Sequence, residues 1–168
     1  MGNKNSLQIS YANQAVILKA WGRLEEAMAL HKKEEGIALD LGNKGQLQRS
    51  YGNQALILIQ QQQLDEALEL LKKKEAICLD LGLKRDLGYC YWYQGWLAGK
   101  QGDKLTEKQK LQQSLAFFAE LNMPRERDKV QSALDQLNSA GPAASKVKAT
   151  AKGTKKGRPT SKAGKKKR

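Results

Sequence analysis

Four aromatic side chains in one short stretch have the types and the spacing of a binding surface. They are Tyr89, Trp92, Tyr93 and Trp96. Steps of three and four residues place the first ring, the last ring and one of the two middle rings on the same face of a helix. Aromatic residues dominate interface hot spots because they offer a large contact area at a low entropic cost. The alternative is that a final helix covers this stripe as part of the core.

Residue types suited to catalysis or metal binding are sparse. The single histidine is His31, and the two cysteines are Cys78 and Cys90. Their spacing is not that of a zinc site. Paired acids fall in the first turns of expected helices, as at Glu25 and Glu26, where the helix dipole explains them. Without a nucleophile and an acid–base set, the sequence predicts a protein that is not an enzyme and needs no cofactor or metal.

A different chemistry, the binding of polyanions, is suggested by the C-terminal segment. Residues 139–168 hold nine lysines, two arginines and no acid, whereas residues 1–138 hold nineteen basic and seventeen acidic side chains. Most of the net charge of +13 therefore lies in this segment. Blocks of like charge bind DNA, RNA or acidic proteins, with an affinity that falls as salt rises. The candidate residues are Lys155, Lys156, Arg158, Lys165, Lys166, Lys167 and Arg168.

The same segment is expected to be disordered, because Val147 is its one aliphatic side chain larger than alanine. The stretch KKGRP at 155–159 resembles the core of the AT-hook, which lies along A·T pairs in the minor groove, although a lysine replaces the first arginine and one copy is present. In a eukaryote, residues 165–168 would also form a nuclear import signal. Two alternatives stay open: non-specific affinity for polyanions, and a solvated tail without a binding role.

The elements that must position these groups form an internal repeat. A shift of 40 residues places 7–46 on 47–86 with 22 of 40 positions identical, and a third copy occupies 87–124. A fixed period of this length predicts a stacked array rather than a globular core. Residues 125–138 supply a partial copy with a thin apolar stripe, as expected of a capping helix. Residues 1–138 thus form one predicted helical repeat domain.

Each copy is predicted to be a pair of helices. In the second copy, apolar residues recur at helical spacing through 47–60 and again through 64–80. Gly22 can close the turn between the helices of the first copy in the left-handed conformation. Gln62 stands at the same place in the second copy, so that turn must be built differently or carry strain. The residues before the first copy align with an inter-repeat linker, which indicates a first helix that is exposed and frayed, or the end of a once longer array.

These features resemble the tetratricopeptide repeat. Its pattern has a small residue in the first helix, a glycine at the turn, a large residue two positions later and an alanine in the second helix. The matching residues are Ala15, Gly22, Leu24 and Ala27 in the first copy and Ala55, Gln62, Leu64 and Ala67 in the second. A usual alanine late in the second helix is replaced by Glu34 and Lys74. With 40 residues in place of about 34, the unit resembles the long kinesin-light-chain-like variety.

The resemblance covers about residues 2–138 and implies an all-α fold, a right-handed α-solenoid of about three and a half helix-turn-helix repeats. In such arrays the first helices line a concave groove, so the implied function is a non-catalytic scaffold that binds a peptide or helix of another protein. An asparagine at the place of Asn13 and Asn53 bonds the ligand in related domains; the alternative is a bond between neighbouring helices. The implied groove residues are Asn13, Arg49, Asn53, Leu56, Tyr89, Trp92, Tyr93, Trp96 and Lys100.

The expected location and partners rest on two features that the sequence does not show, a membrane span and an export sequence. No apolar run is long enough for a membrane span, and no export sequence is recognisable, which predicts a cytoplasmic protein without a membrane partner, or a nuclear one in a eukaryote. Cys78 and Cys90 are then expected to be reduced core thiols. An uncovered first helix would permit end-to-end self-association. The alternative function is a nucleic-acid-associated adaptor, whose tail binds DNA or RNA non-specifically while the array recruits a protein.

Overall fold

The computed structural model describes residues 2–139. Within this range the chain forms seven helices and no strand, so the prediction of an all-α solenoid is confirmed. The predicted tail lies outside the described residues, apart from Ser139. The helices are α1 (Gly2–Ala20), α2 (Leu24–Asp40), α3 (Lys44–Gln60), α4 (Leu64–Asp80), α5 (Lys84–Lys100), α6 (Lys104–Glu120) and α7 (Pro124–Ser139).

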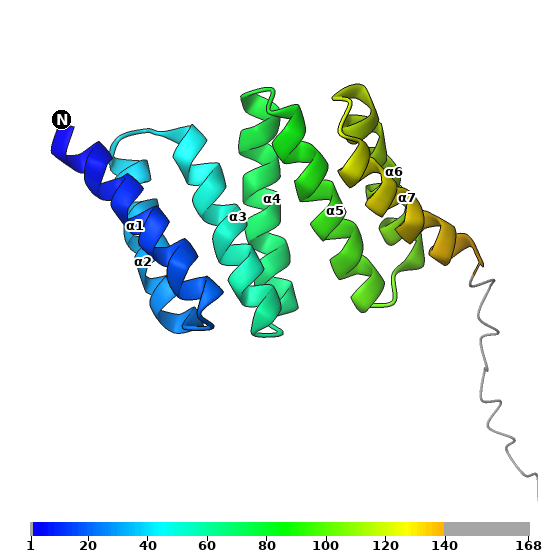
Figure 1. Ribbon diagram of the computed structural model, residues 1–168, viewed down its shortest axis with the longest axis horizontal. Helices are drawn as coiled ribbons and strands as arrows, with labels where there is room; N and C mark the ends of the chain where they lie inside the picture. Colours follow the sequence, from blue (N-terminus) through cyan, green and yellow to red (C-terminus); the bar gives the residue numbers. More distant parts are fainter. Residues whose placement is uncertain (1, 140–168) are drawn as a thin grey trace, which may run out of the picture.

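The helices stand side by side in a row along the longest axis of the molecule (Figure 1). Their main contacts join helices that are consecutive in sequence, from α1 with α2 through to α6 with α7. The first six helices therefore form three pairs, and α7 packs on the last of them. A row in which each unit touches its neighbours is the arrangement of a helical repeat solenoid.

One residue in the left-handed backbone conformation closes the turn inside each pair. Its φ angle is +76° at Gly22 and +84° at Gly102. Gln62 adopts the same conformation, with φ of 62°. The second pair therefore has the same turn as its neighbours and carries the strain of a side chain there, which costs about 1–2 kcal/mol.

The start of α1 differs from the sequence expectation. Gly2 and Asn3 align with the linker residues Gly42 and Asn43, yet they belong to the helix. Gly42 has a φ of +61° because it turns the chain from α2 into α3. No helix precedes α1 among the described residues, so the same two residue types can continue its hydrogen-bonded turns.

An ion pair recurs in every helix pair and ties its open end. It joins a lysine at the start of the first helix to an acid at the end of the second. The pairs are Lys4 with Asp40 at 3.3 Å, Lys44 with Asp80 at 2.6 Å, and Lys84 with Glu120. All six side chains are more than half exposed, so each pair contributes little to stability. Their recurrence shows that the three copies share one geometry.

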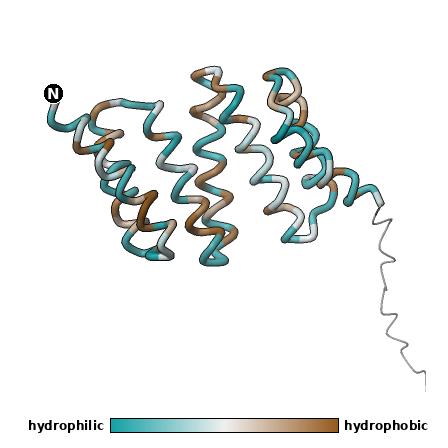
Figure 2. The backbone as a smooth tube through the Cα atoms, in the orientation of Figure 1, coloured by the Kyte–Doolittle hydropathy of each residue, from teal (hydrophilic) through white to brown (hydrophobic). Residues whose placement is uncertain are grey.

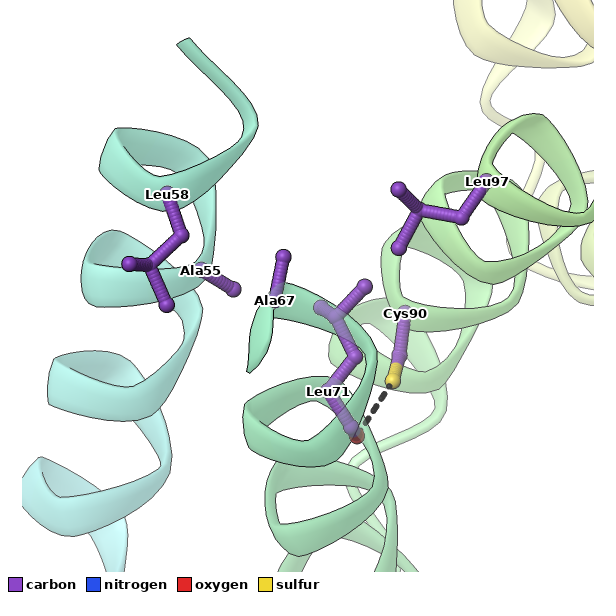
Figure 3. Close-up of a cluster of buried hydrophobic side chains, with 6 residues drawn as sticks. All are labelled: Ala55, Leu58, Ala67, Leu71, Cys90 and Leu97. Atoms are coloured by element: carbon purple, nitrogen blue, oxygen red, sulfur yellow. Dashed lines mark hydrogen bonds between the residues drawn. The ribbon is translucent and has the colours of Figure 1, made fainter. Parts of the chain in front are cut away.

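An aliphatic core forms where α3, α4 and α5 meet (Figure 3). Its buried members are Ala55, Leu58, Ala67, Leu71, Cys90 and Leu97. The Cys90 thiol donates a hydrogen bond to the backbone carbonyl of Leu71 at 3.2 Å. Burial raises the pKa of Cys90 to about 12 and that of Cys78 to about 11. Both cysteines are free and buried, as expected.

The third pair fills its interior differently from the second. Phe118 is fully buried and its ring lies over Gly88, where a Cβ would stand 2.8 Å from the ring atom Cε1. At the equivalent places the second pair has Gln48 and Cys78, a larger residue facing a smaller one. In the third pair, a glycine and a phenylalanine thus fill the same space that a glutamine and a cysteine fill in the second pair.

Helix α7 covers the apolar face of α6 at the C-terminal end of the described array. Its buried residues are Val130 and Leu134, which pack with Leu111 and Phe118. The rest of α7 is mostly hydrophilic (Figure 2). One narrow apolar stripe on an otherwise polar helix is what closes a stacked core toward water.

Two glycines should respond in opposite ways to the same substitution. Gly88→Ala sets a methyl group against the Phe118 ring, and we expect it to lower the free energy of unfolding by about 1–3 kcal/mol. Gly36→Ala adds a methyl group on α2 with no atom within 4 Å, and the better helix former should raise the free energy by about 0.5–1 kcal/mol. Urea unfolding followed by circular dichroism measures both. Shifts of the same sign would contradict this account of the packing.

Candidate protein-binding groove

A hollow of about 330 Å³ lies between α3, α4 and α5. Its wall combines aliphatic, aromatic, amide and charged side chains, the mixture typical of a ligand site. Five of its nine lining residues are groove residues implied by the tetratricopeptide resemblance. The lining consists of Arg49, Gly52, Asn53, Leu56, Leu71, Lys74, Asp86, Tyr89 and Tyr93.

The repeat itself brings these side chains together. Arg49 and Asn53 of α3 are equivalent, after the shift of 40 residues, to Tyr89 and Tyr93 of α5. Each pair is spaced by four residues and therefore lies on one face of its helix. Because α3 and α5 occupy equivalent places in neighbouring pairs, both faces line the same hollow.

Lys74 supplies a buried positive charge to the hollow. The residue is only 7% exposed, and its Nζ donates hydrogen bonds to Gln48 Oε1 at 2.5 Å and to Asp86 Oδ1 at 3.0 Å. Gly52 makes room for it, since a Cβ there would stand 3.2 Å from Lys74 Cδ. With Arg49 added, the lining carries two positive charges against one negative charge. Its field therefore favours a carboxylate or another acidic group.

The side chains of Arg49 and Asn53 keep their polar groups available. No hydrogen bond or ion pair joins either of them to another residue within 2–139. The alternative in which Asn53 bonds only between neighbouring helices therefore has no such bond in the described part of the chain. Asn53 is half-buried and can offer both a donor and an acceptor.

The aromatic stripe of α5 is divided between the core and the hollow. Tyr89 and Trp92 stack with ring centroids 6.4 Å apart, and both rings meet Phe118 edge-on. The Tyr89 hydroxyl also donates a hydrogen bond to Glu126 Oε1 of α7 at 3.0 Å. Burial, followed by the Glu126 carboxylate, raises the pKa of Tyr89. The cluster formed by α6 and α7 thus packs on Tyr89 and Trp92. Tyr89 also lines the hollow, together with Tyr93, which stacks on Trp92.

Four residues implied by the resemblance do not line the hollow. Trp92 packs against the cluster shared by α6 and α7. Trp96 is 36% exposed, and Lys100 Nζ lies 5.2 Å from its ring centroid. Asn13 is exposed on α1, one helix pair away from the hollow. The structure therefore gathers the implied groove residues into one site of five and leaves these four outside it.

Four lining residues were missed by the sequence analysis: Gly52, Leu71, Lys74 and Asp86. The signal for Lys74 was present, because a charged residue replaced the alanine of the repeat pattern. Its partner could not be found from the pattern, since Asp86 belongs to the next helix pair. The role of Gly52 depends on the path of the Lys74 side chain, which the spacing of residues does not reveal.

A larger hollow of about 410 Å³ lies between α2, α3 and α4 and contains none of the implied groove residues. Its lining includes Met28 and Gln54, and their counterparts Leu68 and Gln94 line a hollow of about 200 Å³ one repeat further on. This hollow is therefore a recurring seam between consecutive pairs. The hollow between α3, α4 and α5 is the better candidate site, because it holds the buried charge and the unpaired polar groups.

Across residues 2–139, no cluster of three or more histidine, cysteine, aspartate or glutamate side chains could hold a metal ion. No helix in that range is long and apolar enough to cross a membrane. The candidate polyanion-binding residues, from Lys155 to Arg168, lie outside the described residues.

The Lys74–Asp86 pair should matter more to stability than an exposed ion pair. Asp86→Asn leaves the buried ammonium with neutral partners, and we expect the free energy of unfolding to fall by about 1–3 kcal/mol. Asp80→Asn is the matched control, because its pair with Lys44 is more than half exposed and the substitution should have little effect. Chemical denaturation compares the two variants. Equal losses would show that Lys74 does not depend on the Asp86 charge.

Comparison with known proteins establishes the fold. No family model matches the sequence, and a search of curated proteins finds no match. Among solved structures, the chain is similar to the crystal structure of BtubC (BKLC) from P. vanneervenii, with a TM-score of 0.63 and 13% identity. The likeness covers 98% of this chain and 72% of that chain. At this identity it shows a shared architecture, an array of packed helix pairs.

Proposed function

We propose that this protein is a non-catalytic scaffold that binds a peptide or helix of another protein in the hollow between α3, α4 and α5. The observation that carries the proposal is the unpaired state of Arg49 and Asn53 beside the apolar surfaces of Leu56 and Tyr93. We also propose that the repeat is of the long, 40-residue kinesin-light-chain-like variety, which rests on the period and the residue pattern.

Each lining residue would have a distinct part in binding. The Asn53 amide can bond the backbone of an extended segment through both its donor and its acceptor. The Arg49 guanidinium can bind a carboxylate with two parallel hydrogen bonds, and the nearby Lys74 charge favours the same group. Leu56 and Tyr93 offer an apolar wall to one side chain of the ligand. About 330 Å³ suits a short stretch of peptide.

The environment of the reactive side chains supports a binding role rather than catalysis. The thiolate is the reactive form of cysteine, and raised pKa values of about 11 for Cys78 and about 12 for Cys90 keep both thiols protonated at neutral pH. His31 is fully buried, with its Nδ1 2.8 Å from Glu34 Oε2. None of the three lines the hollow.

Selection of displayed random peptides against the full chain tests the groove. For peptides so selected, we expect Asn53→Ala to weaken binding about tenfold, since losing hydrogen bonds to a desolvated ligand costs roughly 1–3 kcal/mol. Arg49→Glu should abolish binding of acidic peptides. Asn13→Ala is the matched control: it is the same substitution at the equivalent place of the first pair, outside the hollow. Fluorescence anisotropy measures the affinities, and peptides indifferent to Asn53→Ala would refute the proposed site.

A second candidate function rests on the uneven charge of the chain. Residues 139–168 combine eleven basic side chains with no acid, beside an array that is almost neutral. Such a segment can hold the protein on DNA or RNA through phosphate contacts, while the array binds a protein partner. The protein would then be a nucleic-acid-associated adaptor.

Salt dependence distinguishes this adaptor from a scaffold whose tail has no binding role. In the full chain, glutamine replaces the seven candidate residues, Lys155, Lys156, Arg158, Lys165, Lys166, Lys167 and Arg168. If the tail binds phosphates, the affinity for a short DNA duplex falls, and so does the slope of log K against log salt, by about 0.9 for each contact removed. Identical affinities and slopes for parent and variant would eliminate the adaptor.

A further inference from the structure

Helix α1 leaves open the face with which its counterparts pack against the preceding helix pair. Ile17 of α1 is 50% exposed, whereas the equivalent Ile57 of α3 and Leu97 of α5 are both fully buried. Gln14 is likewise exposed, while its counterpart Gln54 is 3% exposed. The residue types on this face are those that form a buried helix–helix contact elsewhere in the array. Here, however, no helix of the described residues covers them.

The contacts of α3 and α5 show what kind of helix fits such a face. Gln54 Nε2 donates a hydrogen bond to Glu35 Oε2 of α2 at 2.7 Å. Gln94 Nε2 donates to Glu75 Oε2 of α4, also at 2.7 Å. In both cases the glutamine of a first helix meets a glutamate on the second helix of the pair before it.

An aliphatic residue accompanies that glutamate. Met28 of α2 and Leu68 of α4 each stand seven positions before the glutamate, and so lie on the same helical face two turns away. Both pack against the aliphatic core around α3, α4 and α5. The covering helix therefore has a recognisable pattern, with an aliphatic side chain at one position and a glutamate seven residues later.

Helix α1 already holds the groups that would meet such a helix. Gln14 Nε2 donates to Ser10 Oγ at 2.9 Å, as Gln54 Nε2 donates to Ser50 Oγ at 3.2 Å. The glutamine is thus held in the same way before any partner binds. At the end of the face Trp21 is 70% exposed, and aromatic side chains of this kind anchor interfaces.

We propose that the face formed by Ser10, Gln14, Ile17 and Trp21 docks an amphipathic helix of another protein. The docked helix carries an aliphatic residue seven positions before a glutamate. It packs on α1 as α2 packs on α3 and as α4 packs on α5. This surface differs from the hollow between α3, α4 and α5, so the inference stands independently of the function proposed above.

A second copy of the chain matches this face less well. In an end-to-end array α7 would meet α1, but α7 aligns with the first helices of the pairs and has no aliphatic residue seven positions before a glutamate. The two helices that do have this pattern are α2 and α4, and they are already packed on α3 and α5. Within residues 2–139 no unpacked helix has the pattern, and we assign the docked helix to a different protein.

A peptide with the sequence of residues 24–40 provides the probe, because it is the α2 sequence that packs on α3. A hydrocarbon staple between positions 25 and 29, both exposed on α2, holds it helical. We expect saturable binding to the full chain by fluorescence anisotropy, weakened at least tenfold by Ile17→Glu. Leu105→Glu is the matched control, since Leu105 is 69% exposed on α6, and it should leave the affinity unchanged. Absence of binding, or equal binding to Ile17→Glu, would overturn the proposal.

A charge exchange tests the seating of the helix. Glu35→Lys in the peptide should weaken binding to the parent chain, and Gln14→Glu in the protein should restore it by at least threefold. No restoration would mean that the peptide does not lie on α1 as α2 lies on α3.

Sedimentation velocity of the full chain alone should show a monomer. A dimer that Ile17→Glu dissociates would assign the face to a second copy and overturn the proposal.

Discussion

The contact between the second helix of one pair and the first helix of the next is the interaction on which the array depends. Within a pair, a short turn keeps the two helices together, but consecutive pairs are aligned by side chains. The glutamine–glutamate hydrogen bonds of Gln54 with Glu35 and Gln94 with Glu75 recur with the same length at both junctions. They fix the angular position of α3 and α5, and thereby the two faces that line the hollow.

The backbone is more similar from one helix pair to the next than the buried side chains are. The interior of the second pair holds a lysine and a glutamine in contact, whereas that of the third holds Phe118 over Gly88. This freedom allows a polar group to enter one interior without changing the helix positions. The hollow is lined by Lys74 and Gly52 of the second pair, at places that other copies fill with different residues, and by Asp86 of the third pair. Function in such an array can therefore reside in a single departure from the repeat.

The helices and turns could be predicted because similar residues recur at equivalent positions of successive copies and therefore indicate the same backbone structure in each. Gln62 is instructive: the repeat indicated a left-handed turn that glutamine disfavours, and the backbone kept the turn. Five lining residues followed from their place in the resemblance, but Lys74 with Asp86 did not, because that ion pair joins different copies. The aromatic stripe was ambiguous for the same reason. Whether Tyr89 and Trp92 face a ligand or a neighbour depends on the position of α7, which helical spacing alone does not determine.

The first pair has an interior that is unusually polar. Gln8, His31 and Glu34 are buried there, and within residues 2–139 His31 Nε2 and Glu34 Oε1 have no hydrogen-bond partner. Burying such atoms offsets part of the gain from packing. In a row stabilised between neighbours, local opening begins where a unit has the fewest contacts and the least apolar interior. Amide hydrogens of α1 and α2 should therefore exchange with solvent before those of α4 and α5.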